Sequence, residues 1–267
     1  WVGGKQEGGK LGDLFAFKQD HIFKDWDDVK ANANNRYDAI GELYGPAAWE
    51  ALKDKAGKQP IEPGDVCWAD LNNDGVINNL DRVKVGNLFP TVTGGFSTTL
   101  GYKDFSLYAR FDYALGHTLY NDLAARSLGQ YQGSFNIIDM VKDSWSETNQ
   151  NTDIPKFYYA DQLSKKNITR SNNGLTAVDN NSSRFYEKGD YLALREITLT
   201  WNLPKKWINK ALMSNASVYV TGQNLFYITG YTGVSPEPAV DTTYGQGLDN
   251  GRYPTPKTVL LGLSVTF

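Results

Sequence analysis

The sequence predicts an all-β fold in which about six strands form the C-terminal part of a transmembrane antiparallel β-barrel with long extracellular loops. From Thr258 to Phe267 the odd positions are apolar, the even ones are mostly small or polar, and the last residue is aromatic. This period of two is that of a strand with one apolar face. Further alternating segments occupy 93–115, 191–201 and 216–227. Long and short connections alternate between them, as in bacterial barrels with short periplasmic turns and long outer loops.

The composition restricts the chemistry that the chain can perform. The 267 residues carry a formal net charge of −3, which offers no basic surface for nucleic acid. The sequence contains no run of about eighteen apolar residues, so it predicts no membrane-spanning helix. One cysteine, Cys67, and two histidines, His21 and His117, leave little for a thiolate metal cluster, a zinc site or a catalytic triad. Because the chain starts at Trp1 without Met or a signal peptide, we expect an N-terminal part to be missing.

The first quarter of the chain predicts mixed local structure. Residues 14–17 read as a short strand, and residues 21 to about 60 read as helices and loops. The sequence 70–81 then matches the ligand spacing of an EF-hand loop, with Gly75 where the chain must turn sharply. The predicted Ca²⁺ ligands are Asp70, Asn72, Asp74, Val76 through its carbonyl, Asn78 and Asp81. Asp81 replaces the usual bidentate Glu, so we expect weaker binding, and a metal-free Asx-rich turn is the alternative.

The hairpin 93–115 provides a check on the strand register. In a hairpin with the two-residue turn Lys103–Asp104, the flanking residues Tyr102 and Phe105 pair and point to the same side. Both belong to the apolar faces of their segments, so the two patterns agree. Arg110 and Asp112 lie on the opposite face, which we expect to line a water-filled lumen. In the segment 191–201 both faces mix apolar and charged residues, so its orientation stays open.

The lengths of the connections predict a topology. With the C-terminus in the periplasm, the turns at 103–104 and 203–214 fall on the periplasmic side. A helix is expected from 135 to 145 within the second long connection. The connections predicted on the extracellular side are 21–91, 118–188 and 228–255.

Ordered motifs along the chain carry a family resemblance. They include Asp70-x-Asn72-x-Asp74-Gly75-x-Ile77 with Asp81-Arg82, Gly94-Gly95-Phe96, Tyr102-Lys103-Asp104-Phe105, Gly189-Asp190-Tyr191-Leu192, Thr221-Gly222-Gln223-Asn224-Leu225 and Tyr253-Pro254-Thr255-Pro256-Lys257. From about Gly9 to Phe267 the chain resembles the C-terminal part of SusC/RagA-type TonB-dependent transporters of the Bacteroidota.

The resemblance implies a barrel of about 22 strands that is plugged by an N-terminal domain. It also implies a SusD-like surface lipoprotein as partner and import of oligosaccharides or peptides with energy passed through TonB, without enzymatic activity. The family's plug and TonB-contacting segment have no counterpart here, so we expect them in the missing N-terminal part. The ending with Gly262, Leu263, Val265 and Phe267 resembles the signal read by the barrel-assembly machinery. The chain would then cross the outer membrane several times, in contact with lipid.

Aromatic rings in the outer loops are candidates for substrate or partner contacts. Tyr231, Tyr244 and Tyr253 could stack on sugar faces or peptide side chains, although interface packing or loop stiffening is the favoured explanation for any single ring. Two rival functions remain. A secreted calcium-binding, dockerin-like or adhesion module would explain the aspartate loop but not the terminal strand or the alternating loop lengths. A glycosidase using Asp112 and Glu196 would need a carboxylate separation that a sequence does not give.

Overall fold

The computed structural model describes residues 7–32, 36–37, 42–43, 62–73, 79–125, 139–157, 182–237, 247–249, 251 and 253–267. The chain divides into two compact units. The sheet unit comprises Phe89–His117, Lys188–Pro238 and Arg252–Phe267. The loop unit comprises Trp1–Leu88, Thr118–Glu187 and Ala239–Gly251. No described helix is long and apolar enough to cross a membrane.

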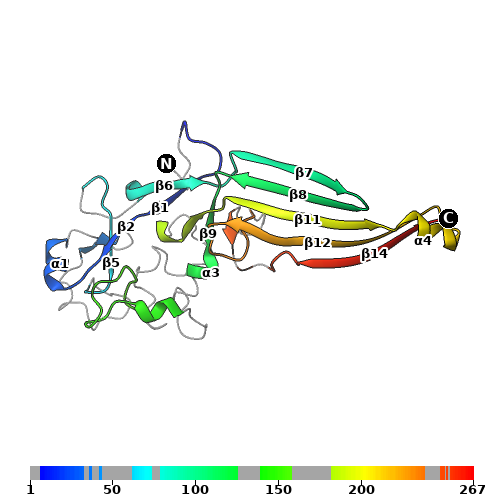
Figure 1. The fold of residues 1–267 in the computed structure, drawn as a ribbon. Coiled ribbons are helices and arrows are strands. Elements are labelled where there is room, and N and C mark those ends of the chain that lie inside the picture. Colours follow the sequence, from blue (N-terminus) through cyan, green and yellow to red (C-terminus); the bar gives the residue numbers. More distant parts are fainter. Residues whose placement is uncertain are drawn as a thin grey trace. The chain divides into compact units, whose positions relative to one another are not determined.

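The sheet unit is built on one five-stranded antiparallel sheet with the order β14-β12-β11-β8-β7 (Figure 1). Its strands are β7 (Val92–Tyr102), β8 (Phe105–Leu115), β11 (Tyr191–Asn202), β12 (Asn215–Thr229) and β14 (Thr258–Thr266). The short helices α4 (Lys205–Ile208) and η7 (Asn209–Ala211) lie in the connection between β11 and β12. The alternating segments of the sequence therefore all form strands of one sheet.

The register of the first hairpin is as predicted. Tyr102 pairs with Phe105, and the pairing continues without a shift to Val92 and Leu115. Lys103 in the turn has a φ of 52°, a left-handed conformation that closes the two-residue connection. At the other edge, Gly262 in β14 pairs with Tyr219 in β12. A Cβ at Gly262 would overlap the ring of Tyr219, so this glycine makes room for the aromatic side chain.

The short connections meet at one end of the sheet. Asn202 N donates to Asp104 O at 2.8 Å, which joins the end of β11 to the β7–β8 turn. Ser214 N donates to Thr266 O at 2.8 Å, so the C-terminus lies at this same end. The pairing of Tyr191 with both Ala114 and Thr229 marks the opposite end, where the chain enters its long connections. The side of the membrane that each end faces stays a prediction.

A β-bulge in β11 resolves the orientation that the sequence left open. Leu194 pairs with Phe111 whereas Glu196 pairs with Arg110, so β11 carries one extra residue, Arg195, relative to β8. The extra residue shifts the alternation by one position. Before the bulge, the even-numbered Leu192 and Leu194 lie on the apolar face. After it, the odd-numbered residues Ile197, Leu199 and Trp201 lie on that same face.

The loop unit consists of short elements. Its strand pairs are β1 (Asp13–Phe17) with β6 (Arg82–Asn87), β2 (Gln19–Ile22) with β5 (Val66–Trp68), and β3 (Arg36–Tyr37) with β4 (Glu42–Leu43). A third group has the order β10 (Tyr186–Lys188), β9 (Thr118–Asn121), β13 (Leu248–Asp249). The described helices are α1 (Trp26–Ala31), α3 (Asp122–Ala125), η1 (Asn79–Asp81), η3 (Asp139–Asp143) and η6 (Ser183–Phe185).

Small apolar clusters hold the loop unit together. Phe17 and Trp68 meet edge to face in the first, which also contains Ile22, Val66 and Trp145. Phe23, Val29 and Cys67 form the second beneath α1. This helix begins at Asp25, whose side chain accepts the N–H of Asp28 and so caps the first turn.

Two sequence predictions differ from the observed elements. The predicted strand 14–17 belongs to β1 of the loop unit, so the described part of the sheet contains five of the roughly six expected strands. In place of the helix expected from 135 to 145, the described residues form a 3₁₀ helix over Asp139–Asp143. Residues 126–138, where that helix was expected to begin, lie outside the described part of the chain.

Candidate functional site

One face of the sheet is apolar and exposed. A row of aliphatic side chains crosses all five strands by direct cross-strand pairing: Leu100, Leu107, Leu199, Val220 and Leu261. On β14 the exposed fractions reach 72% at Val259 and 79% at Leu261. An isolated exposed leucine is ordinary, but a continuous apolar face of this extent is typical of a surface that contacts another apolar phase.

Aromatic side chains flank the aliphatic row. Toward the short turns, Tyr102, Phe105 and Trp201 form the next row, in which the rings of Phe105 and Trp201 stack at 6.1 Å between centroids. Toward the long connections, Phe96 stacks on Phe111 at 4.9 Å. Aromatic belts on both sides of an aliphatic band are the mark of a strand wall in a lipid bilayer.

The strand lengths fit the same environment. β7 and β8 each contain 11 residues. At about 3.4 Å per residue these strands are roughly 35 Å long, and a tilt of about 40° reduces their height to roughly 27 Å. The apolar band of an outer-membrane barrel is about 25 Å tall. The sheet is therefore long enough to cross a bilayer.

The opposite face is polar and carries a network centred on Arg195. Its guanidinium binds both carboxylate oxygens of Asp112, from Nε to Oδ1 at 2.5 Å and from Nη2 to Oδ2 at 2.9 Å. Arg195 also donates to Glu237 and, at 3.2 Å, to the hydroxyl of Tyr227, which itself donates to Glu237 at 2.8 Å. The bulge in β11 places Arg195 on this face, and the network ties β8, β11 and β12 to the segment after β12.

The network adjoins a hollow of about 610 Å³ whose lining includes Ser97, Arg110, Asp112 and Arg195. Two carboxylates share one guanidinium here, so these three side chains together carry one formal negative charge. Because Asp112 is held in a bidentate ion pair, it is poorly placed to act as a catalytic acid or base. Glu196 accepts from Thr198 on the same strand.

The proposed calcium loop is described only at its ends. Asp81 is fully buried, and its Oδ1 accepts the N–H of Leu71 at 2.8 Å, which holds the two ends of the loop together. Asn73 has a φ of 58°, so the chain turns sharply just before the predicted glycine position. Asp70 and Asn72 belong to the described residues, whereas Asp74, Val76 and Asn78 lie outside them. The metal ligands stay a prediction.

The other predicted site residues occupy different environments. Tyr231 is 7% exposed, and a Cβ at Gly233 would overlap its ring, so it packs within its own segment. Tyr253 is fully exposed, and Tyr244 lies outside the described residues. The predicted assembly signal lies in β14 and at the C-terminus, and it consists of Gly262, Leu263, Val265 and Phe267. The side chain of Phe267 is 87% exposed.

Sequence reasoning missed the network around Arg195. Glu237 lies 42 positions beyond Arg195, and Asp112 lies 83 positions before it. No spacing signal links residues that meet only through strand pairing and a bulge. The sequence analysis also missed the pairing of His21 with Cys67, which lie on strands separated by more than forty residues.

Several known proteins are similar to this chain. TonB-dependent receptor P3 of Formosa agariphila is 32% identical over 243 residues, covering 86% of this chain and 22% of that protein. TonB-dependent receptor P26 of the same organism is 32% identical over 217 residues, covering 79% and 20%. TonB-dependent receptor SusC of Bacteroides thetaiotaomicron is 25% identical over 265 residues, covering 98% and 23%. No protein-family model matches the chain.

Solved structures share the fold. The RagAB peptide transporter superposes with a TM-score of 0.60 at 24% identity, covering 76% of this chain and 21% of that chain. The RagAB peptide importer in the 'open-open' state gives a TM-score of 0.59 at 20% identity, covering 96% and 22%.

The sheet has one apolar and one polar face, and its structural neighbours share its fold. Together these define the class of protein, a wall segment of a transmembrane β-barrel. Within that class, the chain belongs to the SusC-type TonB-dependent transporters. It spans 20% to 23% of the length of the curated relatives it matches. These relatives are receptors and transporters rather than enzymes, as the sequence predicted.

Proposed function

We propose that this chain forms part of the barrel wall and outer loops of an outer-membrane importer that is driven through TonB. The observation that supports this most strongly is the aliphatic row across the five strands, flanked by aromatic rings. In lipid no water can hydrogen-bond the backbone, so every strand needs a paired neighbour. The inner strands β8, β11 and β12 each pair with a neighbour on both sides, β12 with β14 over Asn215–Gln223. Neighbouring strands of the barrel would pair with the outer edges of β7 and β14.

The cargo is an oligosaccharide or a peptide, and the partner is a SusD-like surface lipoprotein. The likeness to the RagAB peptide transporter and to the receptor SusC supports this proposal. Uptake of labelled peptides and oligosaccharides by cells with and without the gene tests the cargo. Copurification of a surface lipoprotein with the intact protein tests the partner. A strain that lacks the protein and imports both cargo classes at the wild-type rate would contradict the proposal.

The different connections at the two ends of the sheet support an orientation in the membrane. The short turns and the C-terminus share one end, which we assign to the periplasm, and the long connections leave from the other, which we assign to the cell surface. An epitope inserted after Asp104 should be hidden in intact cells and bind antibody only after permeabilisation. An epitope inserted after Tyr253 should bind antibody on intact cells. The reverse labelling pattern would contradict the assignment.

The loop 70–81 is proposed to bind Ca²⁺ as a brace for the first long connection. The burial of Asp81 and its bond to Leu71 N support it, because they hold the two ends of the loop together. The ion would play no chemical part in transport. Its oxygen donors suit a hard cation such as Ca²⁺.

A further inference from the structure

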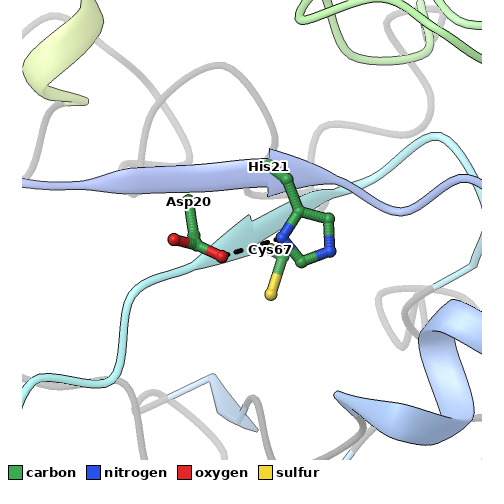
Figure 2. Close-up of side chains that lie close together, drawn as sticks. All are labelled: Asp20, His21 and Cys67. Atoms are coloured by element: carbon green, nitrogen blue, oxygen red, sulfur yellow. Dashed lines mark hydrogen bonds and ion pairs between the residues drawn. The ribbon is translucent and has the colours of Figure 1, made fainter.

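Three side chains with metal-binding atoms converge in the loop unit, on the strand pair β2–β5 (Figure 2). A nitrogen of His21, the sulfur of Cys67 and a carboxylate oxygen of Asp20 all lie within 4.8 Å of one another. His21 pairs with Cys67 across the two strands, so both side chains stand on the same face. The ligands of one zinc ion lie roughly 3.3–3.8 Å apart, given bond lengths of about 2.0–2.3 Å. Small rotations would therefore bring all three within bonding distance of one ion.

A β-bulge brings Asp20 into this group. Gln19 pairs with Trp68 and His21 with Cys67, so Asp20 is the extra residue of β2. Consecutive side chains of a regular strand point to opposite faces, whereas a bulge re-aims one of them. The result is a bond of 2.8 Å between His21 Nδ1 and Asp20 Oδ2. Bulges are enriched next to functional sites because they redirect side chains in this way.

Both ring nitrogens of His21 face carboxylates. Nδ1 faces Asp20 at 2.8 Å, and Nε2 faces Asp28 Oδ1 at 3.1 Å. A neutral imidazole has one N–H, so it can donate to only one of two ionised carboxylates. The other nitrogen would then direct a lone pair at a carboxylate oxygen. A metal ion coordinated jointly by Nδ1 and Asp20 would remove that repulsion.

Hydrogen bonds hold the Asp28 carboxylate in place beside His21. Its Oδ2 accepts the N–H of Lys24 at 2.9 Å, and its Oδ1 accepts from the side-chain amide of Asn32 at 2.9 Å. This carboxylate is therefore held in place, with its side chain 19% exposed, to accept the Nε2–H of His21. A carboxylate that fixes the tautomer of a histidine is the usual outer partner of a metal-bound imidazole.

We propose that Asp20, His21 and Cys67 bind a zinc-type divalent cation, with Asp28 as the positioning residue behind His21. Thiolate and imidazole donors select Zn²⁺ over Ca²⁺ or Mg²⁺. Cys67 is 6% exposed within the second apolar cluster, whereas the side chains of His21 and Asp20 are 32% and 56% exposed. The ion would thus reach the site from the exposed side and leave a fourth position to water. Bound there, it would join β2 to β5.

The test is a metal titration of the intact protein purified from outer membranes in detergent. After removal of bound metal with a chelator, Co²⁺ is added and the near-ultraviolet absorption of cobalt–thiolate charge transfer is followed. The proposal expects one Co²⁺ per chain with this absorption, and its loss when Zn²⁺ is added. Cys67→Ser should abolish the absorption, and His21→Gln should weaken Co²⁺ binding by at least about 10-fold.

Two further variants complete the design. Asp28→Asn should keep the cobalt–thiolate absorption but weaken binding by about 10- to 100-fold, because it removes only the outer partner. Asp27→Asn, on the same helix, serves as the matched control and should bind as the wild type does. Wild-type protein that binds no Co²⁺, or binds it without thiolate absorption, would overturn the proposal. Equal binding by wild type and His21→Gln would do the same.

Discussion

Two neighbouring leucines of β14 test which face of the sheet meets lipid. Leu261 belongs to the aliphatic row and is 79% exposed, whereas Leu260 pairs with Thr221 on the polar face and is 47% exposed. We compare Leu261→Lys with Leu260→Lys. The two variants make the same chemical change, one residue apart, on opposite faces of one strand.

The expected difference follows from the position of the row. A lysine on the lipid face costs about 2–4 kcal/mol at the middle of the bilayer and about 0–1 kcal/mol at its edge. Leu261 lies one row, or roughly 7 Å along the strand, from the aromatic row of Tyr102, Phe105 and Trp201. An intermediate depth gives a cost of about 2 kcal/mol, which is roughly 30-fold in the folding equilibrium. On the polar face, Leu260→Lys should cost at most about 0.5 kcal/mol.

The assay is urea-induced unfolding of the intact protein in lipid vesicles, followed by tryptophan fluorescence. The unfolding midpoint should fall for Leu261→Lys and stay close to that of the wild type for Leu260→Lys. Equal midpoints for the two variants would refute the assignment of the apolar face to lipid, because water on both sides treats both lysines alike. A lower midpoint for Leu260→Lys alone would reverse the assignment.

Three further predictions concern polar contacts. Arg195→Met leaves the carboxylate of Asp112 beside that of Glu237 and should lower the free energy of unfolding in vesicles by about 1–3 kcal/mol. The loss should be smaller in the double variant with Asp112→Asn. An unchanged unfolding midpoint would contradict the network. Hydrogen bonds from Lys84 and Asn87 lower the pKa of Asp13 to about 2, so its stabilisation is present above about pH 4 and is lost as the pH falls toward 2. Hydrogen exchange of β1 and β6 should show this loss in the wild type and not in Asp13→Asn, and the same acid response in both would refute it. Removal of Ca²⁺ should lower the thermal midpoint of the wild type but not that of Asp70→Ala, and a midpoint that ignores Ca²⁺ in both would exclude the ion from the loop.

The strands were predictable because their pattern is local. Alternation in β7, β8, β12 and β14 depends only on which residues belong to the apolar face, and each strand repeats that choice every second position. The hairpin register was equally accessible, since Tyr102 and Phe105 flank a two-residue turn. The family motifs added what periodicity cannot supply, the likeness to transporters.

The bulges were not predictable in the same way. In β11 one extra residue, Arg195, changes which of its neighbours lie on the apolar face, and the sequence shows this only as a mixture of apolar and charged residues on both faces. In β2 the extra residue, Asp20, turns toward His21. A bulge is a property of two paired strands rather than of one, so its position depends on the partner.

The sequence by itself determined the class of fold, the apolar face of the terminal strand and the family, because each is written in short-range alternation or in ordered motifs. The tertiary structure alone decided the phase of β11, the network between Arg195, Asp112 and Glu237, and the meeting of His21 with Cys67. Those contacts join residues far apart in the chain, and strand pairing, whose register no single segment encodes, brings them together.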